Sequence, residues 1–265
     1  MTIRKQSSDW KLNLPSVPRA FLFDTADSTN TFLKEQADLG AEHLSIAVTK
    51  SQSAGRGRGD RVWVSPEGNV FWSILLRPDS SWPSLTSLPL VLALAVHRSL
   101  AQIVGSDSGL KIKWPNDILL DGKKVCGMLL ETSVKQRRGE GHPISWCVVG
   151  IGINVNSHPE ATMNYQATDL VTSGVENVTR DVVIEILSAE VANIVSLWSR
   201  DGFPAFRVEV EGSLAFLGEE IDVVTGVDRE QRQQGRLIGL SKDGLAKIEA
   251  EDGLKTLSAG EVFGI

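Results

Sequence analysis

The chain has 265 residues, 42% of them hydrophobic, and its 27 Lys and Arg residues against 33 Asp and Glu give a net charge of -6. This length and composition predict one sizeable domain with a core of its own and a small second module. An acidic chain lacks the basic surface that general nucleic-acid binding needs, so basic residues gathered in one segment indicate a local anionic ligand.

The first residues lack the apolar core of a signal peptide, and no segment is expected to be apolar over the length that spans a bilayer. Cys126 and Cys147 have no metal-ligand spacing and are expected to be reduced thiols, so a cytoplasmic protein is predicted. Residues 1–19 are polar and contain two prolines, which predicts a poorly ordered lead-in. Two helices and a turn do not fit there, so we expect no helix-turn-helix and no sequence-specific DNA binding.

The first predicted elements surround a cluster of polar residues. Residues 20–24 and 44–48 have the apolar pattern of strands, and residues 31–40 suit a short helix that glycine ends. The segment Asp27-Ser-Thr-Asn30 precedes this helix. One such residue is enough for an N-cap, and four adjacent hydrogen-bonding side chains favour a second use, holding a polar ligand group at the helix start.

A glycine-arginine loop follows the second strand. Gly55, Gly57 and Gly59 alternate there with Arg56 and Arg58. Glycine lets backbone N–H groups approach a ligand closely, and arginine presents a planar fork of donors that matches phosphate oxygens. Such a loop suits a nucleotide phosphate, although the same alternation occurs in solvated or RNA-binding segments. It is neither a Walker P-loop nor a Gly-x-Gly-x-x-Gly dinucleotide motif.

Two long helices and a β-rich end are predicted further along the chain. Apolar residues at helical spacing predict helices over residues 84–104 and 181–200. A buried strand is expected over 145–156, where Gly150 and Gly152 indicate that a ligand or another backbone lies close. Further strands are predicted at 69–77, 110–120, 123–131, 220–224, 234–239, 245–249 and 256–258, the last four forming a small barrel or sandwich that starts near residue 212.

Five motifs occur in a characteristic order: Asp27-Ser-Thr-Asn30, Gln52-Ser-Ala-Gly-Arg-Gly-Arg58, Lys113-Trp-Pro-Asn-Asp117, Lys124-Val-Cys-Gly-Met-Leu129 and Gly150-Ile-Gly-Ile-Asn154. In this order and spacing, the chain resembles the biotin protein ligases from residue 21 to residue 265. The resemblance implies an α+β fold, with a class II synthetase-like catalytic domain over 20–211 and an SH3-like β-barrel over 212–265. The catalytic domain would be a mixed sheet flanked by helices.

The resemblance also implies an activity. The enzyme would join biotin to ATP with Mg²⁺, releasing pyrophosphate, and would transfer biotin from biotinyl-5′-AMP to a lysine of a biotin carboxyl carrier domain. Lys124, Arg56 and Arg58 would be catalytic. Biotin would contact Ser28, Thr29, Asn30, Gln52, Gly55, Arg56, Gly57, Arg58, Lys124, Gly127, Leu129 and Ile153. The nucleotide would contact Arg58, Trp63, Asn116, Asp117 and Asn154, with Asp117 also meeting Mg²⁺.

The implied chemistry agrees with these residue types, because a carboxylate and a triphosphate repel each other and need positive charge between them. No protein nucleophile is required, and a loop that closes over a mixed anhydride keeps water from it. Ser53, Cys126 and Gly59-Asp60 depart from the family's usual pattern, which bears on loop dynamics and affinity. The alternatives are a lipoate or octanoate ligase or transferase, and a biotin or nucleotide sensor without turnover. A monomer or homodimer without membrane attachment is expected.

Overall fold

The structure is a computed structural model that describes residues 4–7, 9–59, 61–79, 82–105, 108–134, 144–160, 166–225 and 231–265. Its larger sheet has eight strands, which lie side by side in the order β1 (Lys5–Gln6), β2 (Ala20–Ala26), β3 (Ile46–Gln52), β4 (Val70–Leu76), β8 (Ile144–Ile153), β7 (Lys123–Val134), β6 (Asp117–Leu120) and β5 (Leu110–Lys113). Strands β2 and β3 pair in parallel and the other neighbours in antiparallel fashion. The predicted mixed sheet is therefore confirmed.

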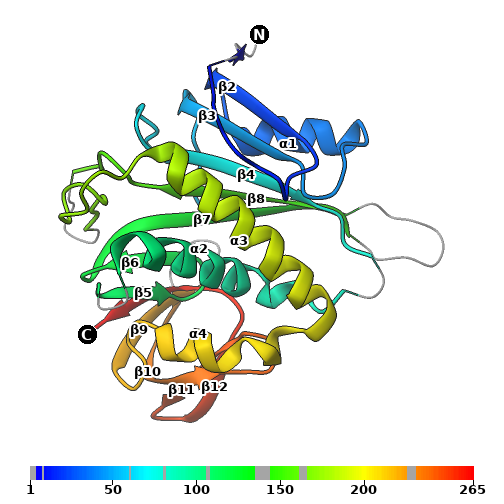
Figure 1. Ribbon diagram of the computed structural model, residues 1–265. Coiled ribbons are helices and arrows are strands. Elements are labelled where there is room, and N and C mark those ends of the chain that lie inside the picture. Colours follow the sequence, from blue (N-terminus) through cyan, green and yellow to red (C-terminus); the bar gives the residue numbers. More distant parts are fainter. Residues whose placement is uncertain are drawn as a thin grey trace.

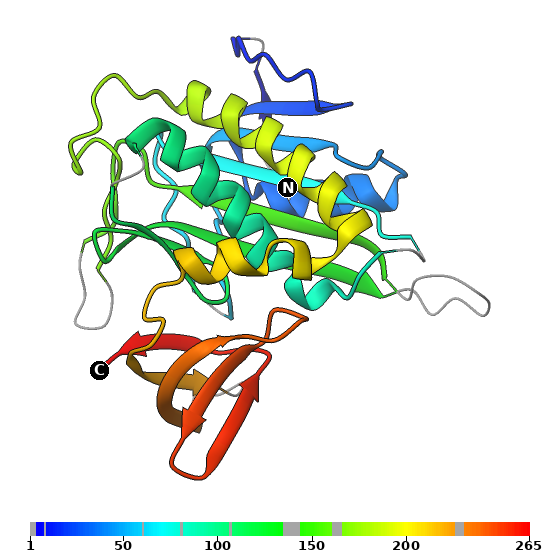
Figure 2. The same ribbon diagram turned by 60° about the horizontal axis from the view of Figure 1, so that its bottom comes forward.

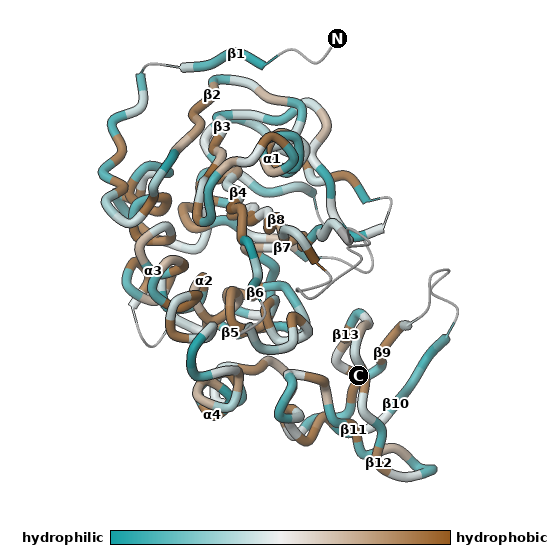
Figure 3. The backbone as a smooth tube through the Cα atoms, turned by 90° about the vertical axis from the view of Figure 1, so that its right-hand side faces the viewer, coloured by the Kyte–Doolittle hydropathy of each residue, from teal (hydrophilic) through white to brown (hydrophobic). Residues whose placement is uncertain are grey.

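Helices cover both faces of this sheet. They are α1 (Thr29–Asp38), α2 (Leu88–Val104), α3 (Arg180–Asp201) and the short α4 (Arg207–Ser213), with 3₁₀ turns at Leu85–Ser87 and Phe203–Ala205. Figure 1 shows α2 and α3 across the front of the strands. Viewed from the side, α1 lies on the opposite face (Figure 3). The colours of Figure 3 also mark hydrophobic residues in α2 and in the central strands, where the core lies.

The two faces of the sheet are separated by side-chain alternation. On β8, Cys147, Val149 and Ile151 belong to the main core under α2 and α3, whereas Trp146 and Val148 belong to a smaller core under α1. In the main core the buried Trp72 indole N–H donates to Ser188 Oγ at 3.0 Å, so its burial leaves no unpaired donor.

Helices α1 and α3, on opposite faces of the sheet, each begin at a residue whose side chain caps the helix. Ser28 accepts a hydrogen bond from the N–H of Thr31 at the start of α1, and Thr179 accepts one from Val182 at the start of α3. Each cap satisfies one of the N–H groups that a helix leaves unpaired. Gly202 ends α3 with φ +70°, a conformation that glycine adopts without strain.

A β-bulge interrupts the pairing of β6 with β7. Ile118 lies opposite Cys126 but Leu119 lies opposite Lys124, so Val125 is an extra residue on β7. Val125 and Cys126 are both fully buried in the main core, although they are consecutive. Because of the bulge, Lys124 and Gly127 face the same side of the sheet despite their odd spacing in the sequence.

The C-terminal module is a five-stranded antiparallel sheet, which confirms the predicted β-rich end. Its strands lie in the order β12 (Gly253–Leu257), β11 (Ala246–Ala250), β10 (Gln231–Leu240), β9 (Glu220–Thr225) and β13 (Glu261–Gly264). Figure 2 shows this module as a separate layer beside the larger sheet. Trp114 Nε1 donates to the carbonyl of Gly244 at 3.2 Å, and the N–H of Leu240 donates to Glu211 at 2.8 Å, which fastens the module to the larger domain.

Two helical segments are apolar enough to cross a membrane by length and composition, Leu85–Val104 and Arg180–Asp201, each with a mean hydropathy of 1.5. The expectation that no segment reaches this length is therefore wrong. Both helices pack on the larger sheet, and 61% and 44% of their apolar windows are buried inside the fold. A helix covered on several sides needs no wide polar face, which accounts for their composition.

The lead-in lies against the larger domain over its described residues. Strand β1 pairs with β2 at the edge of the sheet, and Trp10, Leu12 and Leu14 pack on the main core. The Arg4 guanidinium donates to Asp27 at 2.9 Å and pairs with Glu35 on α1. The sequence gives no apolar alternation from which these contacts could be expected.

Candidate active site

A floor without side chains lies on the α1 face of the sheet. Gly150 and Gly152 share the face of Trp146 and Val148, and Gly127 on β7 lies directly opposite Gly152. A Cβ added to Gly150 would lie 2.3 Å from Asn30 Oδ1, and one added to Gly152 would lie 2.5 Å from the Trp63 indole. These glycines therefore allow other groups to approach the backbone, as their place within a strand predicts.

Polar side chains from three elements meet at the Gly150 end of this floor. The N–H of Thr29 donates to Gln52 Oε1 at 2.9 Å, and Gln52 Nε2 donates to Ser65 Oγ at 3.0 Å. Ser73 Oγ lies 2.6 Å from both Thr29 Oγ1 and Asn30 Oδ1. Sequence reasoning placed the residues at the start of α1 together with Gln52, and the structure brings them together.

The glycine-arginine loop folds back on itself as a short ribbon. The N–H of Gly57 donates to the carbonyl of Arg61 at 2.7 Å, and the N–H of Trp63 donates to that of Gly55 at 3.0 Å. A Cβ at Gly55 would lie 2.3 Å from the Trp63 carbonyl, so only glycine fits there. The ribbon points its two predicted arginines in different directions: Arg56 pairs with Glu131 at 2.8 Å, and Arg58 donates to Asn116 Oδ1 at 3.0 Å.

The Trp63 indole covers the middle of the glycine floor. A Cβ at Gly127 would lie 3.0 Å from Trp63 Cζ3, and the Lys124 ammonium lies 5.5 Å from the ring centroid. Trp63 Nε1 is buried and has no hydrogen-bond partner among the described residues. The indole thus packs on bare backbone, with a cation over its ring.

Charged residues gather at the Gly127 end of the floor. Lys124 Nζ lies 2.8 Å from Asp117 Oδ1, and each of these side chains is 15% exposed. Asn116 Nδ2 donates to the carbonyl of Met128 at 2.6 Å, which leaves its oxygen toward Arg58. Burial lowers the pKa of the nearby Lys113, with the charges of Lys124 and Arg61 acting in the same direction and Asp117 against it. Several cations concentrated in one place predict an anionic ligand.

Glu131 is a member of this site that sequence reasoning missed. It lies on β7 two residues beyond Leu129 and faces the same side of the sheet. Burial opposes its ionisation, but hydrogen bonds from Lys34 and Asn30 and the charge of Arg56 outweigh it, so the pKa of Glu131 is lowered. An acidic residue on the floor strand, paired with a loop arginine far away in sequence, carries no local pattern that would identify it.

Two predicted contact residues lie away from the floor. Ile153 belongs to the main core under α2 and α3, on the face opposite Gly150 and Gly152. Strand alternation dictates this, because Ile153 directly follows Gly152 and consecutive side chains point to opposite faces. Asn154 is buried, and its Nδ2 donates to the carbonyl of Thr168 at 3.0 Å. The backbone beside Thr168 in turn pairs with Lys124, so Asn154 supports the strand that carries the lysine.

The described residues contain no group of three or more His, Cys, Asp or Glu that could hold a metal ion. Asp117, the predicted Mg²⁺ contact, already accepts a hydrogen bond from Lys124. A metal at this carboxylate would have to share it with an ammonium group, which is unfavourable for both cations. We therefore derive no step through a metal that the protein holds by itself.

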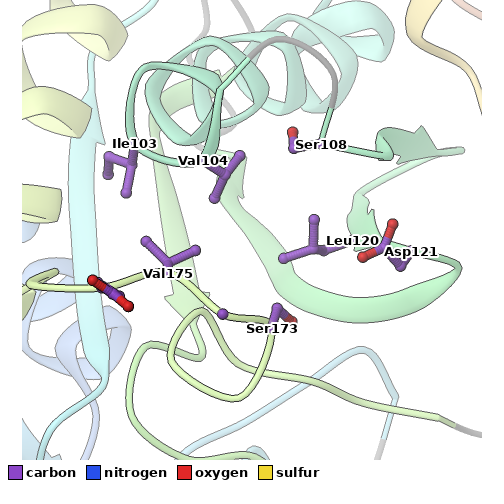
Figure 4. A pocket seen from close by; sticks show the side chains of 9 residues that line it. Ile103, Val104, Ser108, Leu120, Asp121, Ser173 and Val175 are labelled. Carbon is purple, nitrogen blue, oxygen red and sulfur yellow. The ribbon is translucent and has the colours of Figure 1, made fainter.

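A hollow of about 460 Å³ lies elsewhere, near the C-terminal end of α2 (Figure 4). Its lining residues are Ile103, Val104, Ser108, Leu120, Asp121, Ser173, Gly174, Val175 and Glu176. None of them belongs to the candidate site, and Ile103, Val104 and Val175 pack on the main core. The hollow is therefore on the helix side of the sheet, not on the glycine floor.

Together, this fold and site define a domain in which a polar cluster and a group of charged residues lie at opposite ends of one floor of bare backbone. Residues 22–154 match the model of the biotin/lipoate A/B protein ligase family. The chain is 33% identical to a biotin–[acetyl-CoA-carboxylase] ligase of Paracoccus denitrificans, over 89% of this chain and 97% of that protein. It is 30% identical to the bifunctional ligase/repressor BirA of Bacillus subtilis, over 90% and 72%. The structure of a biotin protein ligase from Aquifex aeolicus in complex with biotin and ATP has a TM-score of 0.77 and 29% identity, covering 93% of this chain and 98% of that one.

The chain belongs to the biotin/lipoate A/B protein ligase family. It is thus a ligase, and the proteins to which it is similar are named as biotin ligases.

Proposed function

We propose that the protein joins biotin to ATP and then transfers biotin to one lysine of a biotin carboxyl carrier domain. In the first step a carboxylate oxygen of biotin attacks the α-phosphorus of ATP, and the bond to pyrophosphate breaks. In the second, the amine of the acceptor lysine attacks the acyl carbon, loses a proton, and displaces AMP. The names of the Paracoccus and Aquifex proteins support both substrates and the type of acceptor.

The order of groups along the glycine floor is the observation that carries this proposal. Asn30 lies on Gly150, Trp63 lies on Gly152 and Gly127, and Lys124 lies on Gly127 beside Asp117. A ureido ring would meet the polar end, an acyl tail would lie along the floor beside the indole, and the carboxylate would reach the cations. Lys124 and Arg58 would then stabilise the charge that develops at the α-phosphorus. Mg²⁺ would enter with the nucleotide phosphates, because Mg²⁺ is usually held mainly by them and by water.

The polar end favours biotin over lipoate or octanoate. Thr29, Asn30, Gln52 and Ser73 form one hydrogen-bonded group that a ureido ring could join. A dithiolane or an alkyl chain offers these groups no hydrogen bond, so it would gain less binding free energy there than a ureido ring.

The test is pyrophosphate release from ATP and Mg²⁺ with biotin, lipoate or octanoate as the acid. Release that depends on biotin supports the proposal. Release with lipoate or octanoate alone would establish the alternative ligase, and no release with any acid would leave a sensor. Arg56, Arg58 and Lys124 are the proposed catalytic residues, and Ser28, Gly55, Gly57 and Leu129 line the proposed biotin site.

A further inference from the structure

Glu131 receives four hydrogen bonds, two from side chains on α1 and two from the glycine-arginine ribbon. Its Oε1 accepts from Lys34 Nζ at 2.7 Å and from Arg56 Nη1 at 3.2 Å. Its Oε2 accepts from Arg56 Nη2 at 2.8 Å and from Asn30 Nδ2 at 2.9 Å. A carboxylate has room for about four such bonds, so the capacity of this one is filled.

The carboxylate also joins the glycine-arginine ribbon to α1 and to the floor strand. Arg56 belongs to the glycine-arginine ribbon, whereas Asn30 and Lys34 belong to α1 and Glu131 belongs to the floor strand β7. Arg56 uses both terminal nitrogens, a geometry that fixes its orientation as well as its distance. The ribbon is therefore held down over the edge of the floor next to Leu129.

From these contacts we infer that Glu131 is a positioning residue, a latch that keeps the glycine-arginine ribbon closed over bound acyl-adenylate. This inference rests on the proposed function for the identity of the ligand. The latch itself is the Arg56–Glu131 pair of this structure.

The pair is suited to repeated opening because neither partner is stranded when it breaks. Glu131 keeps the hydrogen bonds from Lys34 and Asn30, and the Arg56 side chain is already 41% exposed to water. Breaking a buried ion pair leaves an unpaired charge and is strongly unfavourable, whereas a half-exposed pair opens at small cost. A lid must open to admit substrates and the acceptor lysine, so a weak charged contact serves better than an apolar seal.

The decisive variant is Glu131→Gln, which keeps the size of the side chain and an oxygen for Asn30 but removes the charge. Enzyme loaded with labelled biotin and ATP is chased with unlabelled biotin in the absence of acceptor, and the loss of labelled adenylate is followed. We expect release to be about fivefold faster in the variant, the effect of one partly exposed ion pair. Rising salt should speed release from the wild type and much less from the variant.

Controls separate a latch from a general structural role. Glu209→Gln removes a similar two-pronged pair with Arg98, at 2.8 and 2.6 Å and away from the site, and should leave release unchanged. Arg56→Ala and the double variant with Glu131→Gln should release adenylate at the same rate as each other, because the latch is already lost. Effects that multiply in the double variant, or an unchanged rate in Glu131→Gln, would overturn the inference.

A second measurement needs no substrate. Hydrogen exchange at the Gly57 and Trp63 amides of ligand-free protein should be faster in Glu131→Gln, because both amides close the ribbon. If the wild type forms no adenylate, the proposed function fails, and exchange alone decides whether the latch exists. Equal exchange in the two proteins would refute it.

Discussion

Single residues set the shape of this site more than its elements do. Gly127, Gly150 and Gly152 leave the floor bare, and the extra residue Val125 turns Lys124 to the same side. A strand without the bulge would point the lysine into the main core. The chemistry of the site therefore depends on one irregularity of pairing.

We predict that Gly152→Ala will weaken biotin binding by about tenfold or more, because its methyl group would lie 2.5 Å from the Trp63 indole and displace it. The measurement is KM for biotin in pyrophosphate release. Gly212→Ala is the matched control, since an added Cβ there has nothing within 4 Å. An unchanged KM in Gly152→Ala would mean that the indole position has no bearing on binding.

Lys124→Ala should lower the rate of adenylate formation by about 10²–10³, the usual effect of removing one group that stabilises transition-state charge. Its thermal unfolding should change little, because the partner Asp117 is partly exposed and can be hydrated. Lys123→Ala serves as control, since this neighbouring side chain is exposed. Equal rates in the two variants would remove Lys124 from the reaction.

At the scale of elements, a segment outside the sheet holds the lysine strand in place. The backbone of Lys124 pairs with that of Gln166 at 2.9 Å and of Thr168 at 3.0 Å. The next residue, Asp169, is 99% buried and accepts from the N–H of Thr172 at 2.7 Å and from His158 at 2.6 Å. The Asp169 carboxylate therefore holds together, by hydrogen bonds, the segment that supports Lys124.

Asp169→Asn should lower the free energy of unfolding by about 1–3 kcal/mol, because the amide cannot accept all these bonds. Burial acts to raise the pKa of Asp169, but the hydrogen bonds from Thr172 and His158 lower it by more. The pKa of Asp169 is therefore below its ordinary value of 3.8. A carboxylate whose pKa is lower in the folded state stabilises the fold fully at pH values above its unfolded-state pKa. This stabilisation is lost as the pH falls through the folded-state pKa. The stability difference between wild type and variant, measured by urea unfolding, should therefore shrink below about pH 4. A difference that grows toward acid pH would contradict this.

The glycine-arginine ribbon, residues 53–66, is expected to open and close locally. Two of its backbone hydrogen bonds join the ribbon only to itself, and its described arginines are exposed or partly exposed, which favours local opening. We expect limited proteolysis within 53–66 to slow when biotin and ATP are both added. Cleavage at the same rate with and without them would show that the ribbon does not close on a ligand.

At the scale of the whole molecule, local sequence patterns predicted most of the elements and few of their contacts. Helices over 84–104 and 181–200 and the central strands were foreseen because apolar periodicity is a local property. The short α4 and β13 were missed, since neither is long enough to show a period. The contacts of Glu131 and the bulge at Val125 depend on pairing between distant strands, which no local pattern encodes.

The C-terminal module extends the site through the same kind of distant contact. Arg58 donates to the carbonyl of Gly260 at 3.1 Å, and Arg61 pairs with Glu261. The ribbon thus touches the module at the end where the cations gather. A movement of the ribbon would therefore break or form contacts with the C-terminal module.

The proposed transfer of biotin can be measured by mass spectrometry of a purified biotin carboxyl carrier domain incubated with this protein, biotin, ATP and Mg²⁺. We expect a single biotinylated lysine on the carrier, formed with the wild type and almost absent with Lys124→Ala. An unmodified carrier after incubation with the wild type, under conditions in which a known biotin protein ligase modifies it, would refute the proposed function.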